Sequence, residues 1–228
     1  GNFINSISKQ NIRVVNPANQ TDVGFIDEAL EEEIDLAFDA ASKAYQKRIL
    51  QDMDPNKKSF YLRAIAKKLR EYKSYGSQIL SKENGKTLLQ CEGEFDGAAS
   101  VFDYYAGITD KIEYKLIPSS NNTFNYVILE PYGVSLQIIP WNYPISLFAR
   151  SVAVSLVVGN TIVIKPPELC PISSNIFGKI FEEIELPPGL VNIVHGYGED
   201  TGKRLVKHKK VNQIVFTGST EVASEIIK

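Results

Sequence analysis

Short apolar runs alternate with stretches of helical periodicity along the second half of the chain. The runs are rich in valine and isoleucine and too short to be typical helices, so each is predicted to be a buried strand. The predicted strands are 134–139, 161–165, 191–194 and 213–217. The predicted helices lie near 144–157, 173–183, 199–206 and 219–228. Strands separated by helices of this length indicate crossover connections, so the pattern predicts an α/β fold with an open parallel sheet flanked by helices.

The first half of the chain predicts two short strands followed by helices. The strands are expected at 12–15 and 23–26, on either side of an Asn-Pro turn. The helices that follow are marked by apolar residues at helical spacing and by a cap residue placed before proline. The predicted helices are 34–45, one that begins at the Asp54-Pro55 pair, and 87–106.

A two-stranded hairpin is predicted between these helices and the parallel sheet. Apolar and β-branched residues fill 114–117 and 123–129, and the turn residues of 118–122 separate them. The two open edges of such a hairpin favour pairing with another chain. The alternative is a hairpin folded back onto its own sheet.

The first strand of the parallel sheet leads into a rigid turn. Pro140 ends the strand, and Pro144 is well placed to open the next helix because proline is tolerated at a first helical position. Between them the turn presents the amide side chain of Asn142. Ligands sit at the ends of such strands in open α/β sheets, so Asn142 is a candidate site residue. The alternative is that Asn142 only caps the turn, and Trp141 and Tyr143 are expected to pack around the site.

Two further turns carry polar residues that suit a ligand. Lys165 and Glu168 stand three residues apart on a turn stiffened by two prolines, a donor and an acceptor for the two hydroxyls of a ribose. Gly218 permits close backbone approach, and Ser219 stands at a helix start, where amide N–H groups suit a pyrophosphate. A lone Lys/Glu pair is commonly a surface salt bridge, and a lone Thr-Gly-Ser-Thr turn is more often a helix cap.

The familiar dinucleotide fingerprint is absent from the sequence. No G-x-G-x-x-G motif follows the first parallel strand. The nearest glycine pattern is Gly196 and Gly198 with Gly202, after the third strand. Judged on this feature alone, a nicotinamide cofactor would be disfavoured.

Charge and composition exclude several classes of function. The chain has 25 Lys and Arg against 27 Asp and Glu, a formal net charge of −2, so nothing indicates binding to nucleic acid. No apolar run is long enough to span a bilayer and no charged-then-apolar leader is seen, so no membrane association is expected. Cys91, Cys170, His195 and His208 have no metal-ligand spacing, so no metal site is expected. Reduced thiols are typical of a cytoplasmic protein.

Four segments resemble the signature motifs of one enzyme family. They are Pro140-Trp-Asn-Tyr-Pro144, Thr161-Ile-Val-Ile-Lys-Pro-Pro-Glu168, Leu186-Pro-Pro-Gly-Leu-Val-Asn-Ile-Val194 and Val215-Phe-Thr-Gly-Ser-Thr220. In this order and at this spacing they resemble the aldehyde dehydrogenase superfamily, which oxidises aldehydes to carboxylates with NAD(P). The resemblance covers essentially the whole chain, but only the N-terminal portion of the family, and it stops abruptly at Lys228. The Glu83-Asn-Gly-Lys86 segment resembles the family's E-x-G-K turn and is interpreted as structural.

The resemblance implies a division into three parts. Residues 1–110 are expected to be an N-terminal helical segment packed on the dinucleotide domain, and 111–131 a protruding hairpin for oligomerisation. Residues 132–228 are expected to be an incomplete Rossmann-like NAD-binding domain, and the family's catalytic domain is absent. Aldehyde dehydrogenases bind the dinucleotide in a variant manner, so the missing glycine motif agrees with the resemblance.

The resemblance also implies roles for individual residues. Asn142 is the expected catalytic residue, an amide donor to the oxygen that gains charge when an aldehyde is oxidised through a cysteine thiohemiacetal and hydride transfer. Lys165 and Glu168 are expected to hold the adenosine ribose, and the carboxylate favours NAD over NADP because it would repel the additional phosphate. The expected cofactor-binding residues are Ile139, Pro140, Trp141, Lys165, Glu168, Gly198, Gly202, Phe216, Gly218 and Ser219.

The nucleophilic cysteine and the general-base glutamate of the family are not found in this sequence. In the family both lie beyond the 215–220 motif, the glutamate in a Leu-Gly-Gly-Lys segment. Cys91 and Cys170 do not occupy the nucleophile's place in the motif order and are expected to be neutral thiols. The isolated chain is therefore expected to be inactive, the cofactor-binding half of an enzyme that acts on an aldehyde. Its first half leans towards the succinate-semialdehyde branch.

Two alternatives of other classes stay open from the sequence. The chain is compatible with a non-catalytic nucleotide-binding fragment, or with an oligomerisation fragment that uses only the hairpin. The incomplete sheet is expected to have an unpaired strand edge and exposed apolar surface, which favour association with another chain. The expected partners are therefore further copies of the chain or a complementary C-terminal half.

Overall fold

The computed structural model describes residues 3–4, 6, 11–120 and 122–228, and its elements follow the predicted order. The strands are β1 (Asn11–Val15), β2 (Asp22–Asp27), β3 (Lys115–Ile117), β4 (Asn125–Val127), β5 (Val134–Ile138), β6 (Thr161–Lys165), β7 (Val191–Ile193) and β8 (Gln213–Phe216). The helices are α1 (Glu31–Gln46), α2 (Pro55–Asn84), α3 (Leu88–Ala106), α4 (Pro144–Val158), α5 (Asn175–Glu183), the π-helical turn η1 (Gly198–Gly202), α6 (Lys203–Lys207) and α7 (Thr220–Ile227).

The four strands of the second half form one parallel sheet in the order β7-β6-β5-β8. β5 lies inside the sheet, and its last residue, Ile138, is opposite Lys165 of β6 and Phe216 of β8. Because the strands all run in one direction, their carboxyl ends meet at one edge of the sheet. The turns that follow the four strands therefore begin side by side.

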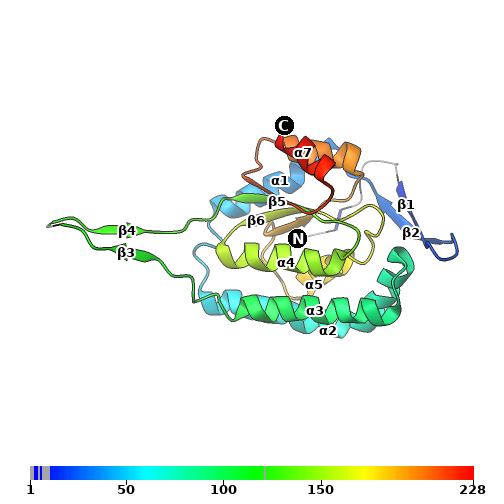
Figure 1. The fold of residues 1–228 in the computed structure, drawn as a ribbon, viewed down its shortest axis with the longest axis horizontal. Coiled ribbons are helices and arrows are strands. Elements are labelled where there is room, and N and C mark those ends of the chain that lie inside the picture. The colour runs from blue at the N-terminus through cyan, green and yellow to red at the C-terminus, as the bar shows by residue number, and fades with distance from the viewer. Residues whose placement is uncertain (1–2, 5, 7–10, 121) are drawn as a thin grey trace.

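Helices cover both faces of this sheet (Figure 1). One face packs against α1 and α6, and the other packs against α4 and α5, which the long helices α2 and α3 cover in turn. Alternate residues of β6 join different clusters: Val163 packs with α1, whereas Ile162 and Ile164 pack with the α4 side. This two-residue period is the one expected for a strand buried on both faces.

Aromatic rings join α3, α4 and α5 into one core. Phe148 of α4 stacks on Phe177 of α5 with ring centroids 4.1 Å apart. Phe102 of α3 and Phe181 of α5 approach the same Phe177 ring, with centroids 6.3 and 6.1 Å away. Phe177 is completely buried, so its ring connects the sheet-covering helices to the outer helix pair.

The β3–β4 hairpin is an antiparallel sheet of its own and extends away from the body of the molecule (Figure 1). Every residue of both strands is exposed. The alternative of a hairpin folded back onto its own sheet is therefore wrong. The predicted strand 123–129 is also too long: β4 spans only Asn125–Val127, because it ends where the three paired residues of β3 end.

Two predicted helices differ from the observed ones. The predicted helix 199–206 is the π-helical turn η1 followed by the short α6, because glycines at both ends of η1 weaken regular helix formation and Thr201 is bonded to Glu28. α5 begins at Asn175 instead of 173. The N–H groups of Ile172 and Ser173 are bound by the carboxylate of Glu83, ahead of the helix.

No helix in the described part of the chain is both long and apolar enough to cross a lipid bilayer.

The aromatic core generates a stability prediction. Phe177→Ala is expected to lower the free energy of unfolding by about 3–5 kcal/mol, because it removes a completely buried ring from the stack with Phe148. Phe60→Ala, at a ring that is 65% exposed, is the control and should change the free energy by less than about 1 kcal/mol. Urea unfolding followed by circular dichroism measures both. Equal losses in the two variants would contradict this account of the core.

Candidate functional site

The turns after β5, β6 and β8 are joined by hydrogen bonds at their first residues. The N–H of Ile139 donates to the carbonyl of Lys165 at 3.1 Å, and the N–H of Thr217 donates to the carbonyl of Ile138 at 3.4 Å. Ile139 is buried and Pro140 is half-buried, so the start of the β5 turn is held inside the protein. The predicted site residues on these three turns thus begin from one shared edge.

Lys165 and Glu168 form an ion pair at this edge. The Nζ of Lys165 lies 2.9 Å from Oε2 of Glu168 and also donates to the carbonyl of Pro166 at 3.2 Å. The lysine side chain is 3% exposed and the carboxylate 31%, so the pair is a salt bridge at a strand end, as the alternative expects, but its lysine is buried. Burial alone would raise the pKa of Glu168, but the charge and hydrogen bond of Lys165 outweigh it, and the pKa of this carboxyl is lowered. The turn therefore presents an ionised, partly exposed carboxylate.

The glycines after β7 lie beside this pair. The N–H of Gly198 donates to Oε1 of Glu168 at 3.3 Å, and a Cβ at Gly202 would lie 3.8 Å from the methylenes of Lys165. That spacing is ordinary contact, so the lysine does not require glycine at 202. Position 196 does require glycine, because a Cβ there would clash with the hydroxyl of Thr201 at 1.9 Å.

The turn after β8 opens α7. The hydroxyl of Ser219 accepts a hydrogen bond from the N–H of Val222 at 3.3 Å, so the side chain acts as a helix cap, as the simpler interpretation expects. The ring of half-buried Phe216 folds against Gly218, where a Cβ would lie 2.3 Å from the ring. Gly218 and Ser219 are exposed. The turn thus leaves a bare backbone facing outward at the start of a helix.

Asn142 is exposed, and only the oxygen of its side-chain amide makes a hydrogen bond within the described part of the chain. Its Oδ1 accepts a hydrogen bond from the N–H of Tyr143 at 3.0 Å, and among the described residues Nδ2 has no protein acceptor. The N–H₂ group is therefore available to a ligand oxygen. The rings of Trp141 and Tyr143 are 57% and 56% exposed, and the ammonium of Lys86 lies 3.9 Å from the centroid of the Tyr143 ring. The expectation that the two rings pack around the site stays a prediction.

The junction between α2 and α3 also contacts the site turns, which the sequence interpretation missed. Glu83 accepts hydrogen bonds from the N–H groups of Ile172 and Ser173 at 2.8 and 2.9 Å, just beyond the turn that carries Lys165 and Glu168. Burial raises the pKa of Glu83 to about 7. One signal was present in the sequence: Glu83 follows Leu80 by three residues and so shares the buried face of α2.

Both cysteines are buried, protonated thiols. Burial raises the pKa of Cys91 to about 11 and that of Cys170 to about 12. The Sγ of Cys170 donates to the carbonyl of Trp141 at 3.4 Å. The prediction of neutral thiols is confirmed, and neither sulfur is an activated nucleophile.

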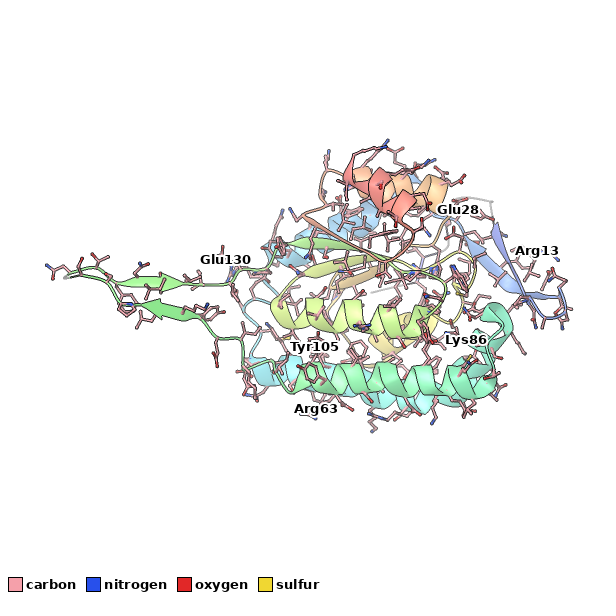
Figure 2. The ribbon with its side chains drawn as sticks, in the orientation of Figure 1. Arg13, Glu28, Arg63, Lys86, Tyr105 and Glu130 are labelled. Atoms are coloured by element: carbon pink, nitrogen blue, oxygen red, sulfur yellow. The ribbon has the colours of Figure 1, made fainter. Side chains whose placement is uncertain are left out.

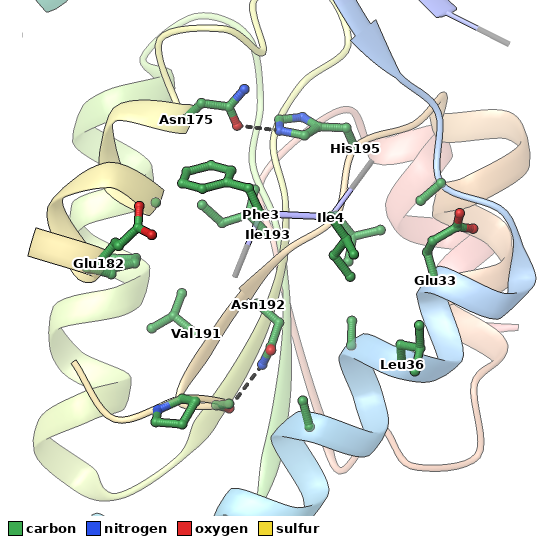
Figure 3. Close-up of a pocket in the computed structure, with 18 of the residues that line it drawn as sticks. Phe3, Ile4, Glu33, Leu36, Asn175, Glu182, Val191, Asn192, Ile193 and His195 are labelled. Carbon is green, nitrogen blue, oxygen red and sulfur yellow. Dashed lines mark hydrogen bonds between the residues drawn. The ribbon is translucent and has the colours of Figure 1, made fainter. Parts of the chain in front are cut away.

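A separate hollow of about 580 Å³ follows β7 between α1 and α5 (Figure 3). At one end Nε2 of His195 is 2.7 Å from Oδ1 of Asn175, and burial lowers the pKa of His195 to about 4. None of the predicted site residues lines this hollow. Within the described ranges, no group of three His, Cys, Asp or Glu side chains is placed to hold a metal ion.

The raised pKa of Glu83 predicts how stability depends on pH. In the unfolded chain this carboxyl titrates near 4.5, and in the folded chain near 7. Between these values the folded state binds more protons, so the free energy of unfolding falls as pH rises through this window. The parent should therefore lose stability relative to Glu83→Gln as pH rises from about 5 to about 8, measured by urea unfolding. Glu113→Gln, at an exposed carboxylate, is the control; a parent and a Glu83→Gln variant with the same pH profile would contradict the prediction.

Sequence comparison identifies related proteins over almost all of the chain. The family described as "Aldehyde dehydrogenase family" matches residues 3–228. An aldehyde dehydrogenase of Aspergillus niger is 32% identical over 228 residues, which is 100% of this chain and 46% of that protein. Betaine aldehyde dehydrogenase 1 of Oryza sativa is 38% identical over 221 residues, 94% of this chain and 44% of that protein. The chain thus spans about half the length of these relatives.

Structural comparison agrees. A structure titled as the NAD+ complex of an aldehyde dehydrogenase from Bacillus cereus superposes with a TM-score of 0.96 at 33% identity. The match covers 100% of this chain and 46% of that one. With a family match over residues 3–228 and this shared α/β fold, the chain belongs to the aldehyde dehydrogenase family.

Proposed function

We propose that the chain is the NAD-holding part of an aldehyde dehydrogenase, an oxidoreductase that converts an aldehyde to a carboxylate. The observation that carries the proposal is the buried Lys165 paired with a partly exposed, ionised Glu168 at the carboxyl edge of the sheet. The strand order supports it. In chain order the strands lie 3-2-1-4, which is the order of the first four strands of the dinucleotide-binding fold.

The donor set of this edge fits the ribose of a dinucleotide. Glu168 offers carboxylate oxygens as acceptors for the ribose hydroxyls, and Lys165 offers an ammonium beside it. A 2′-phosphate at the same place would meet the negative charge of Glu168. NAD is therefore the proposed cofactor in preference to NADP.

The remaining turns suit the rest of the cofactor. Gly198 and Gly202 flank the ion pair without side chains, and the Gly218-Ser219 backbone opens α7 towards solvent. A helix start of this kind attracts a pyrophosphate through its N–H groups. Bound NAD would supply the acceptor for the hydride that leaves the aldehyde.

Asn142 is the proposed oxyanion donor. Its free N–H₂ group lies on the turn after β5, between the strands that carry the other site residues. Ile139, Pro140 and Trp141 are the proposed cofactor contacts on the same turn. A preorganised amide donor aimed at the oxygen that gains charge is worth about two to three orders of magnitude in rate.

Aldehyde turnover by this 228-residue polypeptide alone is not expected. Its only two thiols are buried with raised pKa, so neither supplies the thiolate that the reaction needs. Succinate semialdehyde as the substrate and a cytoplasmic location stay predictions from the sequence.

Calorimetric titration tests the cofactor site. Glu168→Ala is expected to weaken NAD binding about ten- to a hundredfold, because a charged acceptor for the ribose hydroxyls is lost. The same variant should narrow the difference between NAD and NADP affinities, because the repulsive charge is gone. Glu182→Gln, on the exposed side of α5 and away from the carboxyl edge, should bind NAD like the parent. A parent that binds no NAD would end the proposal.

The hairpin supports a second function, the joining of protomers. Its strands carry large exposed apolar side chains, among them Leu116 and Tyr126, which lie opposite each other. Exposed apolar edges of this kind mark protein contacts. We propose that the hairpin pairs with another copy of the chain.

Light scattering tests this second function. The double variant Leu116→Lys and Tyr126→Lys is expected to lower the mass to that of a monomer, because two charges would be buried in the contact. The matched control, Ser120→Lys with Thr123→Lys, adds the same charge in exposed positions at the hairpin tip and should keep the parent's mass. A monomeric parent, or a double variant that keeps the parent's mass, would remove this function.

A further inference from the structure

The α2–α3 junction reaches the turn that carries Asn142. α2 ends at Asn84, Gly85 follows in the left-handed conformation with φ 85°, and α3 begins at Leu88. Lys86 lies in this junction, at the end of the helix pair nearest the carboxyl edge of the sheet (Figure 2). The junction was expected to be a structural turn, but its polar side chains contact functional segments.

One contact holds the backbone immediately before Asn142. The side-chain Nδ2 of Asn84 donates to the carbonyl of Trp141 at 2.7 Å. The thiol of Cys170 donates to the same carbonyl at 3.4 Å, and Asn84 Nδ2 also lies 3.6 Å from this sulfur. The peptide group that joins Trp141 to Asn142 is thus fixed by two side chains from other segments.

A second set of contacts holds the backbone after Asn142. The ammonium of Lys86 lies 3.9 Å from the centroid of the Tyr143 ring and pairs with Oε2 of Glu94 at 2.6 Å. Oε1 of Glu94 accepts hydrogen bonds from the N–H groups of Ile145 and Ser146 at 2.9 and 3.1 Å. The N-cap residue of α4, Tyr143, makes no side-chain cap, so a carboxylate from α3 caps this helix in its place.

The backbone is therefore held in place on both sides of Asn142. Its own Oδ1 is bound to the N–H of Tyr143, which leaves Nδ2 as the free group of the turn. The donor has to be placed to within a fraction of an ångström to favour a transition state. We propose that the α2–α3 junction is a clasp in which Asn84, Lys86 and Glu94 are positioning residues for the Asn142 amide. This inference rests on the proposed role of Asn142 as the oxyanion donor.

Asn84 is the clasp residue that can be replaced without disturbing the fold. The helix stop belongs to Gly85, whose N–H bonds to the carbonyl of Ser81, so α2 ends without help from the asparagine side chain. Glu94 is different, because it is buried and caps α4, and its loss would disturb the fold. Asn84 is therefore the position at which to test the clasp.

The test measures the motion of the Asn142 turn in the 228-residue chain. In ¹⁵N relaxation the backbone amide of Asn142 should have an order parameter near about 0.85 in the parent and below about 0.6 in Asn84→Ala. The side-chain N–H₂ signals of Asn142 should shift in the same variant. Lys82→Ala, an exposed position on the same helix turn, is the matched control and should keep the parent values. An Asn142 turn as rigid in Asn84→Ala as in the parent would overturn the clasp.

A second substitution and a second measurement test whether the rigidity of the turn comes from the hydrogen bond that Asn84 donates. Asn84→Asp keeps the shape of the side chain but has no N–H to donate, so it should loosen the turn as Asn84→Ala does; a rigid turn in this variant would also overturn the clasp. The emission of Trp141, the only tryptophan in the chain, reports the same turn through its anisotropy, which should fall in both variants.

NAD titration separates the clasp from the proposed function. Asn84→Ala should weaken NAD binding less than Glu168→Ala does, since the Lys165–Glu168 pair is untouched and only the turn that carries Trp141 is loosened. A loss of NAD affinity in Asn84→Ala as large as that in Glu168→Ala would contradict a role confined to the Asn142 turn. A parent without NAD affinity would defeat the proposed function, while the rigidity measurements would still decide whether the clasp exists.

Discussion

The candidate site depends on how β5 is paired with both of its neighbours. β5 is hydrogen-bonded to β6 on one side and β8 on the other, and only this register brings Ile138, Lys165 and Phe216 level at the edge. Polar side chains inside the sheet mark the register: Ser135 donates to Gln213 of β8 at 2.9 Å, and Gln137 donates to Ser135 at 2.7 Å. A slip by one residue would move the turn about 3.3 Å and reverse every side chain of β5. The spacing of the turns that carry the candidate site residues is therefore a consequence of strand pairing.

Buried charges then fix the turns at that edge. Glu83 and Glu94 have the same structural role in two places. Each carboxylate accepts hydrogen bonds from two successive backbone N–H groups of a neighbouring segment. Their electrostatic surroundings differ. Glu94 is neutralised by Lys86, whereas Glu83 has no ion pair in the described part of the chain, and its pKa is raised to about 7. A buried charge without a partner is costly, so Glu83 takes up a proton near neutral pH.

The fold could be predicted from the sequence wherever the signal was local and periodic. The β5, β6, β7 and β8 strands, their parallel arrangement and the proline start of α4 followed from short apolar runs and cap residues. The candidate residues on the turns could be named because Lys165 is the last residue of a strand and Glu168 and Asn142 follow strand ends within a few positions. The grip of Asn84 on Trp141 could not be predicted, because it joins residues 57 positions apart and depends on how α2 lies against α4. The exposure of Trp141 and Tyr143 could not be predicted either, because it depends on which distant segments lie over the turn.

The clasp changes how the parts of the chain relate to each other. Residues 1–110 look like a helical segment packed onto a cofactor domain, yet the hydrophobic core passes through both without a break, from Phe102 of α3 to Phe177 of α5. The polar contacts cross the same border, since the carboxylate that caps α4 comes from α3. A parallel sheet without the helix pair would lose the carboxylate that caps α4 and the hydrogen bond from Asn84 to Trp141. The N-terminal helices are thus part of the support of the candidate site, because Asn84 of α2 donates to the carbonyl of Trp141 and Glu94 of α3 caps the helix that follows Asn142.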